Sequence, residues 1–173
     1  MEPTDFPDRN PVPDEQRRAA ERRYHASEWH GRTRHSKRGP RDFDIEKWTI
    51  PGWMLQRMRR DDLVKPKVVH SIWRNYELSS ELIAIDALAC PSVEAAHDRL
   101  IEALARNEAA AMERHTGKQA IGDVAFVTAG TAILFARANL IVQIRNLGAQ
   151  SAPLEKIALQ LDKLIEKPGP ARK

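Results

Sequence analysis

The feature that most constrains the fold is a repeated change of hydrophobic period from Trp53 onwards. Segments in which apolar residues recur at every second position alternate with two segments in which they recur at helical spacing. A two-residue period is typical of a strand with one buried face, and spacings of three and four residues are typical of an amphipathic helix. Three strand-like segments precede each helix-like segment, so the order is βββα followed by βββα.

The pattern predicts six strands and two main helices. The strands are expected at residues 53–58, 67–74, 81–89, 123–128, 132–137 and 140–145. Ser92 is expected to cap the first main helix, and Pro153 introduces the last one. Asn107–Arg114 is expected to form a further short helix. Arg59–Asp62 is interpreted as a polar turn, and Gly130 supplies a positive φ to another turn.

Short connections between these segments indicate mainly antiparallel strands with helices packed on at least one face of the sheet. Residues 81–89 are apolar on both faces apart from Asp86, as expected of a central strand. We therefore predict one α+β domain at residues 47–168, followed by a disordered tail at 169–173. The order of elements resembles the PsbP-like sandwiches, which implies an accessory or assembly role but assigns no functional residue.

A basic arm of about 46 residues precedes this domain. Within Gln16–Arg41 there are nine Lys and Arg residues against two acidic residues, a charge of about +7, whereas the whole chain of 173 residues carries +4. The remainder of the chain therefore sums to about −3, and the basic character belongs to the arm. Four prolines in residues 1–14 favour extended backbone.

The middle of the arm is expected to be a helix and then a linker. Asp14 is expected to cap a helix that runs from Glu15 to about Trp29, with arginines dominating its surface. Residues 31–40 show no apolar period and are interpreted as a basic linker.

Aromatic residues among the arginines indicate that the arm packs on a surface. Phe6, Tyr24 and Trp29 lie within the polar arm, although solvated tails lack apolar groups to bury. The surface is either that of a partner protein, that of a nucleic acid, or the chain's own domain. The candidate partner-binding residues are Arg17, Arg18, Arg22, Arg23, Tyr24, Trp29, Arg32, Arg34, Lys37 and Arg38.

Cys90 is the main candidate for covalent chemistry. It lies between a predicted strand and the N-terminus of a predicted helix, where the helix dipole stabilises a thiolate. The nearest histidine in the sequence, His97, lies on the helix and is not aimed back at Cys90. Lone cysteines in such domains are usually small buried hydrophobes, and we interpret Cys90 in this way.

The histidines and carboxylates give a weak case for metal binding or hydrolysis. His25, His30 and His35 are five residues apart, a spacing that places successive side chains about 140° apart around a helix, whereas helical ligand pairs lie three or four residues apart. Asp86 is the only carboxylate expected among apolar neighbours, and such a residue usually accepts from an arginine or a backbone amide. The eight glycines form no phosphate-binding loop, and no cofactor is predicted.

The composition favours a cytoplasmic protein without a membrane segment. A single cysteine excludes an internal disulfide and a four-thiolate zinc site. No apolar run approaches the length of a membrane span, and the first residues lack the features of a secretion signal.

Together these observations predict a non-enzymatic accessory or structural subunit that docks on a larger protein assembly through its Arg- and Trp-rich arm. The first alternative is a nucleic-acid-binding accessory protein that uses the same arm. The second alternative is a small thiol-dependent enzyme that uses Cys90. A homo-oligomer is compatible with the sequence.

Overall fold

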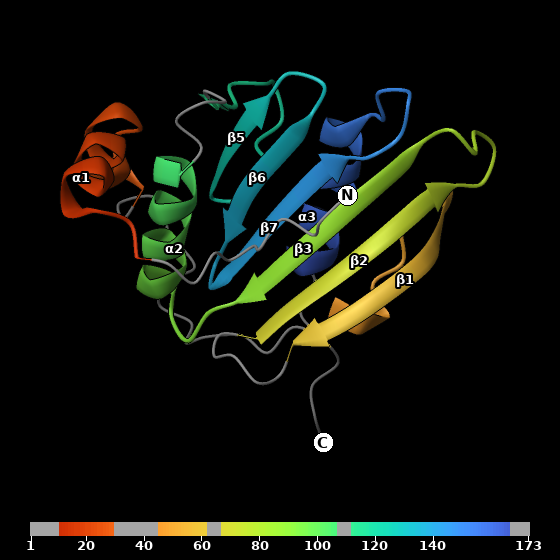
Figure 1. Cartoon of the computed structure of the whole chain (residues 1–173), viewed down its shortest axis with the longest axis horizontal. Coiled ribbons are helices and arrows are strands. Elements are labelled where there is room, and N and C mark those ends of the chain that lie inside the picture. Colours follow the sequence, from red (N-terminus) through yellow and green to blue (C-terminus); the bar gives the residue numbers. More distant parts are fainter. Residues whose placement is uncertain (1–10, 30–44, 62–66, 107–111, 167–173) are drawn as a thin grey trace.

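The computed structural model describes residues 11–29, 45–61, 67–106 and 112–166 (Figure 1). Within them the chain has an α+β fold built on one antiparallel sheet. The strands are β1 (Trp53–Asp61), β2 (Lys67–Asn75), β3 (Leu82–Ala89), β4 (Glu113–Arg114), β5 (Val124–Thr128), β6 (Ala132–Arg137) and β7 (Leu140–Asn146). The helices are α1 (Asp14–Arg23), α2 (Val93–Arg106) and α3 (Leu154–Glu166), with short 3-10 helices η1 (Ala26–Glu28) and η3 (Ile45–Lys47).

The seven strands follow the order β1-β2-β3-β7-β6-β5-β4, and every pair is antiparallel. Two meanders, β1-β2-β3 and β5-β6-β7, meet where β3 pairs with β7. The central position of β3 is the one that its apolar character on both faces predicted.

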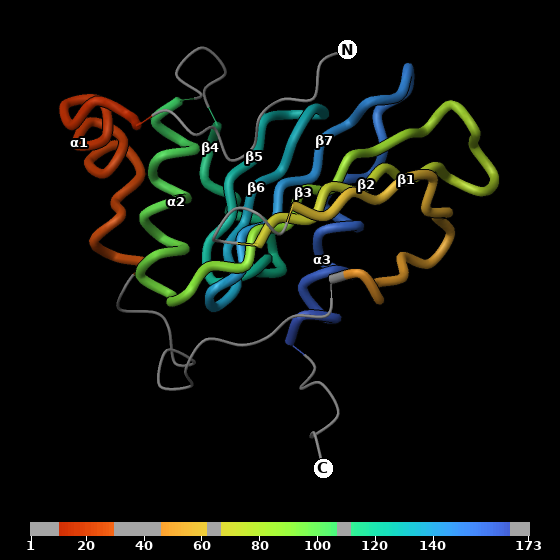
Figure 2. Tube along the Cα trace, turned by 60° about the horizontal axis from the view of Figure 1, so that its bottom comes forward, coloured from red at the N-terminus to blue at the C-terminus, as the bar shows by residue number. Residues whose placement is uncertain are grey.

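Helices cover both faces of the sheet, and each face has its own hydrophobic core. On one face α3 contributes Ile157, Ala158 and Leu161 to a core that includes Trp53 and Phe135 of the strands. On the other face α2 packs over the β5-β6-β7 half of the sheet, and α1 packs on α2 (Figure 2). The alternation of the strands explains this division, because successive residues of one strand enter opposite cores.

The strand pattern predicted most of the sheet but missed part of it. The prediction of a turn at Arg59–Asp62 is wrong for Arg59, Arg60 and Asp61, because β1 continues to pair with β2 as far as Asp61, which lies opposite Val68. Asp62 lies outside the described residues. The predicted helix over Asn107–Arg114 is wrong at its end, because Glu113–Arg114 forms β4 against β5. Residues 107–111 lie outside the described residues. The sheet therefore has seven strands rather than six.

The predicted helix at residues 15–29 is also corrected. It begins at Asp14 with Pro13 as its N-cap, so Asp14 is the first helical residue and not the cap. It ends at Arg23, and η1 follows as a separate turn. Among the described helices none is both long and apolar enough to cross a membrane. The predicted tail at 169–173 lies outside the described residues.

Candidate binding surface

The described part of the arm is a helix with matched charges at its two ends. Asp14 and Glu15 occupy the first turn of α1, and Arg22 and Arg23 occupy the last. Each pair opposes the partial charge of the helix dipole at its end and stabilises the helix. The first backbone bond runs from the Arg17 amide to the Pro13 carbonyl at 3.0 Å. Local sequence thus favours α1, but at ten residues it needs packing to be stable.

The chain leaves α1 through a left-handed residue rather than a glycine. His25 has φ 51° and ψ 49°, a conformation in which histidine is enriched relative to most residues with a Cβ. After this reversal η1 brings Trp29 back beneath the helix end, where its indole Nε1–H donates to the Tyr24 carbonyl at 3.1 Å. This bond satisfies a carbonyl at the C-terminal end of α1 that has no partner within the helix.

Tyr24 and Trp29 are buried in the chain's own core. Their exposed fractions are 8% and 2%. Phe126 of β5 lies between them, with ring centroids 5.1 Å from Tyr24 and 5.3 Å from Trp29, and Trp29 also meets the ring of His97 on α2 edge-on at 6.0 Å. Such aromatic contacts add stability beyond the area that they bury. The sequence left three surfaces open for these two side chains: a partner protein, a nucleic acid or the chain's own domain. They pack on the chain's own domain.

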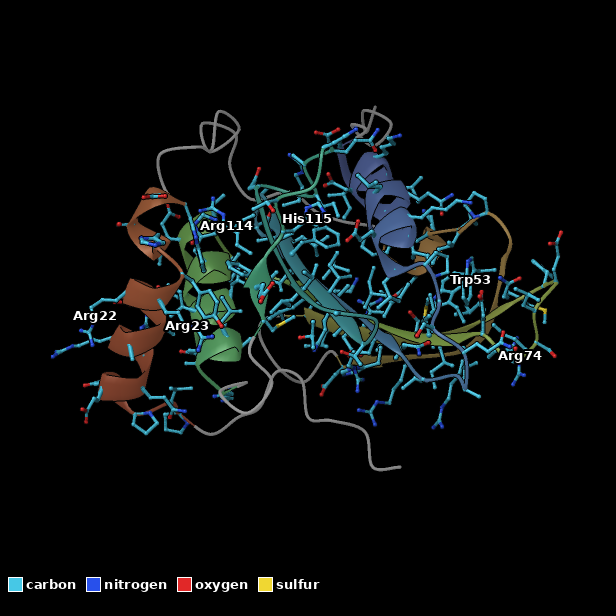
Figure 3. All side chains as sticks on the ribbon, turned by 90° about the horizontal axis from the view of Figure 1, so that it is seen from above. Arg22, Arg23, Trp53, Arg74, Arg114 and His115 are labelled. Carbon is cyan, nitrogen blue, oxygen red and sulfur yellow. The ribbon has the colours of Figure 1, made fainter. Side chains whose placement is uncertain are left out.

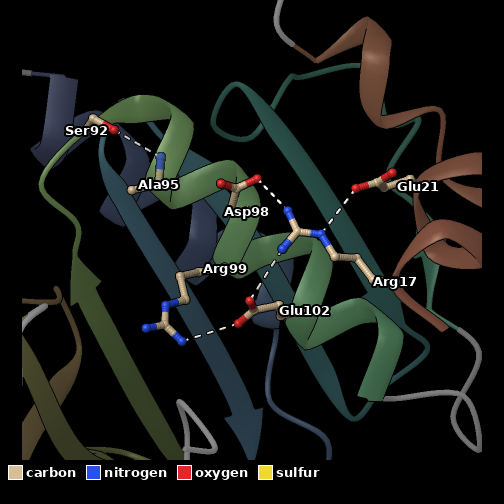
Figure 4. Close-up of polar contacts among 7 residues, drawn as sticks. All are labelled: Arg17, Glu21, Ser92, Ala95, Asp98, Arg99 and Glu102. Atoms are coloured by element: carbon tan, nitrogen blue, oxygen red, sulfur yellow. Dashed lines mark hydrogen bonds and ion pairs between the residues drawn. The ribbon is translucent and has the colours of Figure 1, made fainter. Parts of the chain in front are cut away.

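Arg17 forms ion pairs that connect α1 to α2 (Figure 4). Its guanidinium donates to Asp98 at 2.8 Å and lies 3.6 Å from Glu102, both on α2, while Glu21 accepts from its Nε at 3.3 Å. Burial opposes the charge, but the hydrogen bond to Glu21 and the three carboxylates together raise the pKa of Arg17. Gln16 adds a bond from its side-chain amide to the Ala105 carbonyl at 2.9 Å. Arg17 therefore holds the arm in place.

Of the arginines in the described part of the arm, three are exposed. Arg18, Arg22 and Arg23 are exposed on α1, and Figure 3 shows Arg22 pointing away from the body of the molecule. Arg23 lies over the Tyr24 ring, with its guanidinium carbon 5.4 Å from the centroid. We call Arg18, Arg22 and Arg23 the α1 arginine surface. Arg32, Arg34, Lys37 and Arg38 lie outside the described residues.

The residues considered for metal binding do not form a site in the described part of the chain. Of the three histidines in the arm only His25 is described, and His30 and His35 lie outside. No group of three His, Cys, Asp or Glu side chains among the described residues is placed to hold a metal ion. A cleft of about 590 Å³ beside His25 is lined by Glu21, Arg22 and Asp98, among others, and so presents both charge signs.

Cys90 lies in an environment that opposes thiolate chemistry. Its side chain is buried, with 4% exposed, and burial raises the thiol pKa from 9.0 to about 12 in spite of the charge of Arg99. Ser92 caps α2 by accepting from the Ala95 amide at 3.0 Å (Figure 4), so the helix N-terminus lies beyond Cys90. A nucleophilic cysteine requires a lowered pKa and access to solvent, and Cys90 has neither.

Asp86 has the donors that the sequence predicted for a buried strand carboxylate. Its side chain is 3% exposed, and it pairs with the His70 Nδ1 at 2.6 Å and accepts from Arg145 at 3.2 Å. His70 and Arg145 come from β2 and β7, the two neighbours of β3. No described helix covers this part of the sheet, which faces the viewer in Figure 1. Further along the strands α2 does cover this side, where Val68, Leu88 and Ile141 join its core. We call the side chains of β1, β2, β3 and β7 on this side that no described helix covers the open face.

The sequence did not predict a second buried cluster of charged residues, around Arg137. Arg137 donates to both oxygens of Asp162 on α3 at 2.7 and 2.6 Å and to Asp123 at 3.3 Å. Burial would lower the pKa of Arg137, but the bond to Asp162 and the charges of Asp162, Asp123 and Glu166 raise it. Asp162 also accepts from the Gly122 amide at 2.9 Å. The cluster fastens α3 to the sheet, and its carboxylates are occupied by these bonds.

Comparison with protein-family models, with curated proteins and with solved structures finds no match for this sequence. The resemblance of the element order to the PsbP-like sandwiches therefore stays a prediction. The division at residues 46 and 47 also stays a prediction, although Tyr24 and Trp29 share a core with α2 and β5.

Proposed function

We propose that this protein is a non-enzymatic accessory subunit that docks on an acidic surface of a larger protein assembly through the α1 arginine surface. The observation that carries the proposal is that Arg18, Arg22 and Arg23 are exposed on a helix whose C-terminal end is fixed by buried Tyr24 and Trp29. The backbone of a preorganised helix loses little freedom on binding, and arginine is favoured in protein interfaces.

The roles of the arm residues differ within this proposal. Arg18, Arg22 and Arg23 contact the partner, whereas Arg17, Tyr24 and Trp29 hold the helix that presents them. Burial of the two aromatic rings also removes them as platforms for stacking on bases, which weakens the nucleic-acid alternative. The raised pKa of Cys90 argues against the thiol-enzyme alternative.

The experiment compares three full-length chains, each purified with and without nuclease treatment from extracts of cells that normally make the protein. The test variant carries Arg18→Glu, Arg22→Glu and Arg23→Glu. The matched control carries Lys118→Glu, Lys156→Glu and Lys163→Glu, which reverses the same number of exposed cations away from α1. Co-purified proteins are quantified by mass spectrometry, and circular dichroism verifies that each chain is folded.

We expect the same set of proteins to co-purify with the unaltered chain and with the control variant. This set should be lost with the α1 variant. Charge-reversed contacts in an interface typically cost several kcal/mol, enough to abolish recovery. Equal recovery with the α1 variant would remove the arginine surface from the interaction. Recovery that disappears on nuclease treatment alone would instead establish the nucleic-acid alternative, because the arm would then act through phosphates.

A further inference from the structure

β1 forms one edge of the sheet, at the end opposite α1 (Figure 1). It runs for nine residues and pairs with β2 on one side, while no described strand pairs with its other side. An edge of this length offers a row of backbone donors and acceptors to a further strand. The register shifts between Leu55 and Arg57, so β1 carries a bulge near its start.

The exposed large apolar side chains of the described residues gather at the start of this edge. They are Met54 (41% exposed), Leu55 (40%), Tyr76 (66%) and Leu78 (50%). Tyr76 and Leu78 belong to the connection between β2 and β3, and the Tyr76 amide donates to the Gly52 carbonyl at 3.0 Å, which holds this connection beside the start of β1. Met54 lies opposite Arg74 and Leu55 opposite Trp73, so the two side chains lie on opposite faces of β1 and flank the edge from both sides. Single exposed apolar residues are ordinary, whereas four around one corner of a sheet favour an interaction there.

The far half of the same edge is cationic. Arg57 and Arg59 are exposed, and their positions opposite Ile72 and His70 place them on the open face. Neither has a carboxylate partner among the described residues, whereas Arg60 on the other side of β1 pairs with Glu46 at 2.8 Å. We call Met54, Leu55, Arg57, Arg59, Tyr76 and Leu78 the β1 edge surface. It is apolar at the beginning of the strand and positive at Arg57 and Arg59, before the strand ends at Asp61.

We propose that the β1 edge surface binds an extended acidic segment of a partner protein, which adds to the sheet as a strand beside β1. Apolar side chains of the segment lie against Met54, Leu55 and Tyr76, and its carboxylates pair with Arg57 and Arg59. Backbone hydrogen bonds along an edge supply affinity, and side chains at alternate positions supply specificity. This inference does not depend on the proposed role of α1, which lies at the other end of the molecule.

Charge and chemistry distinguish this occupant from the others. A second copy of the chain pairing edge to edge would bring its own Arg57 and Arg59 against this positive strand, and like charges oppose such a pairing. A single-stranded nucleic acid would match the arginines, but it offers no aliphatic groups to Met54, Leu55 and Leu78. Arginines and a bulge also protect edges from aggregation, yet protection alone leaves the apolar corner unexplained.

The experiment titrates the full-length protein with synthetic peptides of about ten residues, the usual length of a long strand. The acidic probe has valine and tyrosine in one half and glutamate alternating with threonine in the other. One control peptide replaces each glutamate by lysine, and another places proline in the centre, which prevents strand pairing. Affinity is measured by fluorescence anisotropy, and backbone protection by hydrogen exchange.

Two protein variants test the two halves of the surface. Arg57→Glu with Arg59→Glu removes the cationic half, and Met54→Ser with Leu55→Ser removes the apolar half. The matched control is Lys156→Glu with Lys163→Glu on α3. All altered side chains are exposed, so folding is expected to survive, and circular dichroism checks it.

The expected result is binding of the acidic peptide, an affinity at least about tenfold weaker in each β1 variant, and new protection of β1 amides. Several results would overturn the inference. These are no binding of the acidic peptide at about 1 mM, equal binding of the lysine or proline peptide, stronger binding of oligothymidine, and protection of β1 that grows with protein concentration without any peptide.

Discussion

At the scale of single residues, burial decides what Cys90 can do. Because the pKa of its thiol is raised to about 12, almost no thiolate exists at neutral pH in the folded chain. We expect iodoacetamide to leave Cys90 unmodified at pH 7.5 until urea unfolds the protein, as followed by intact-mass spectrometry. Rapid alkylation of the native chain would contradict the burial and revive the thiol-enzyme alternative.

The same raised pKa has a consequence for stability at high pH. The unfolded thiol ionises near 9.0 and the folded thiol only near 12, so the folded state keeps a proton that the unfolded state releases. The contribution of this proton to the free energy of unfolding is therefore fully present below pH 9.0 and is lost as the pH rises towards 12. Urea denaturation should show a smaller decline over this window for Cys90→Ala than for the unaltered chain, because the variant lacks this ionisation.

Gly122 is a residue whose replacement should be costly for two separate reasons. Its φ is 61°, and a Cβ there would collide with the Ala136 carbonyl oxygen of β6. We expect Gly122→Ala to lower the free energy of unfolding by about 2–4 kcal/mol. Gly52 is the matched control, since its φ is 84° but a Cβ meets nothing within 4 Å. Gly52→Ala should therefore cost only about 1 kcal/mol, and equal losses in urea denaturation would contradict the collision.

The environment of a single residue could be predicted from the sequence where it depends on neighbouring residues in the chain. Asp86 was expected to need a donor because its neighbours in the strand are apolar, and His70 and Arg145 supply two. The hydrogen bond between Arg137 and Asp162 joins residues 25 positions apart, and no local hydrophobic pattern predicts it. Its partners depend on where α3 lies over the sheet, which the sequence alone does not specify.

Among the helices and strands, the sequence predicts a strand correctly where apolar residues fill it and turns flank it. It fails where charged residues interrupt the two-residue hydrophobic period. The strand at 132–137 has the predicted limits, because apolar residues fill it and turns flank it. Arg59 and Arg60 resemble a turn in the sequence, but an edge strand can carry both, Arg59 on its open face and Arg60 on the other side, where it pairs with Glu46. The helix end at Arg23 was missed because His25, and not a glycine, takes the left-handed conformation.

The packing of α1 and η1 leads to a prediction about Trp29. Its side chain is 2% exposed and joins the end of α1 to Phe126 and His97. Removing a buried aromatic ring leaves a cavity, so Trp29→Ala should destabilise the protein by about 3–5 kcal/mol. Tyr76→Ala, at a 66% exposed position, is the control and should change stability by less than about 0.5 kcal/mol. Similar urea midpoints for the two variants would contradict the burial of Trp29.

At the scale of the whole molecule, the two proposed binding surfaces lie at opposite ends of one sheet (Figure 1). The α1 arginine surface and the β1 edge surface share no residue, and the sheet lies between them. Distant sites without shared contacts usually act additively. The glutamate variants of α1 and β1 should therefore each impair one interaction and leave the other unchanged, which anisotropy and co-purification can measure on the same samples.

The shared core also predicts how the whole chain unfolds. Ala20, Tyr24, Ala26 and Trp29 lie in one cluster with α2 and β5, so the arm and the rest of the chain should unfold in one transition. Urea curves from tryptophan fluorescence and far-ultraviolet circular dichroism should therefore coincide for the full chain. A chain that begins at Lys47 uncovers Phe126 and should lose at least about 3–5 kcal/mol, a large share of the stability of a typical domain.

The truncated chain allows a direct control, because the missing contacts can be returned. A synthetic peptide of residues 11–29 should raise its urea midpoint, since any segment that binds only the folded state stabilises it. The same peptide with Trp29→Ala should do so much less, because Trp29 fills the space beside Phe126. If the truncated chain unfolds at the same urea concentration as the full chain, the arm contributes nothing to the core, and its helix must be held by the partner instead.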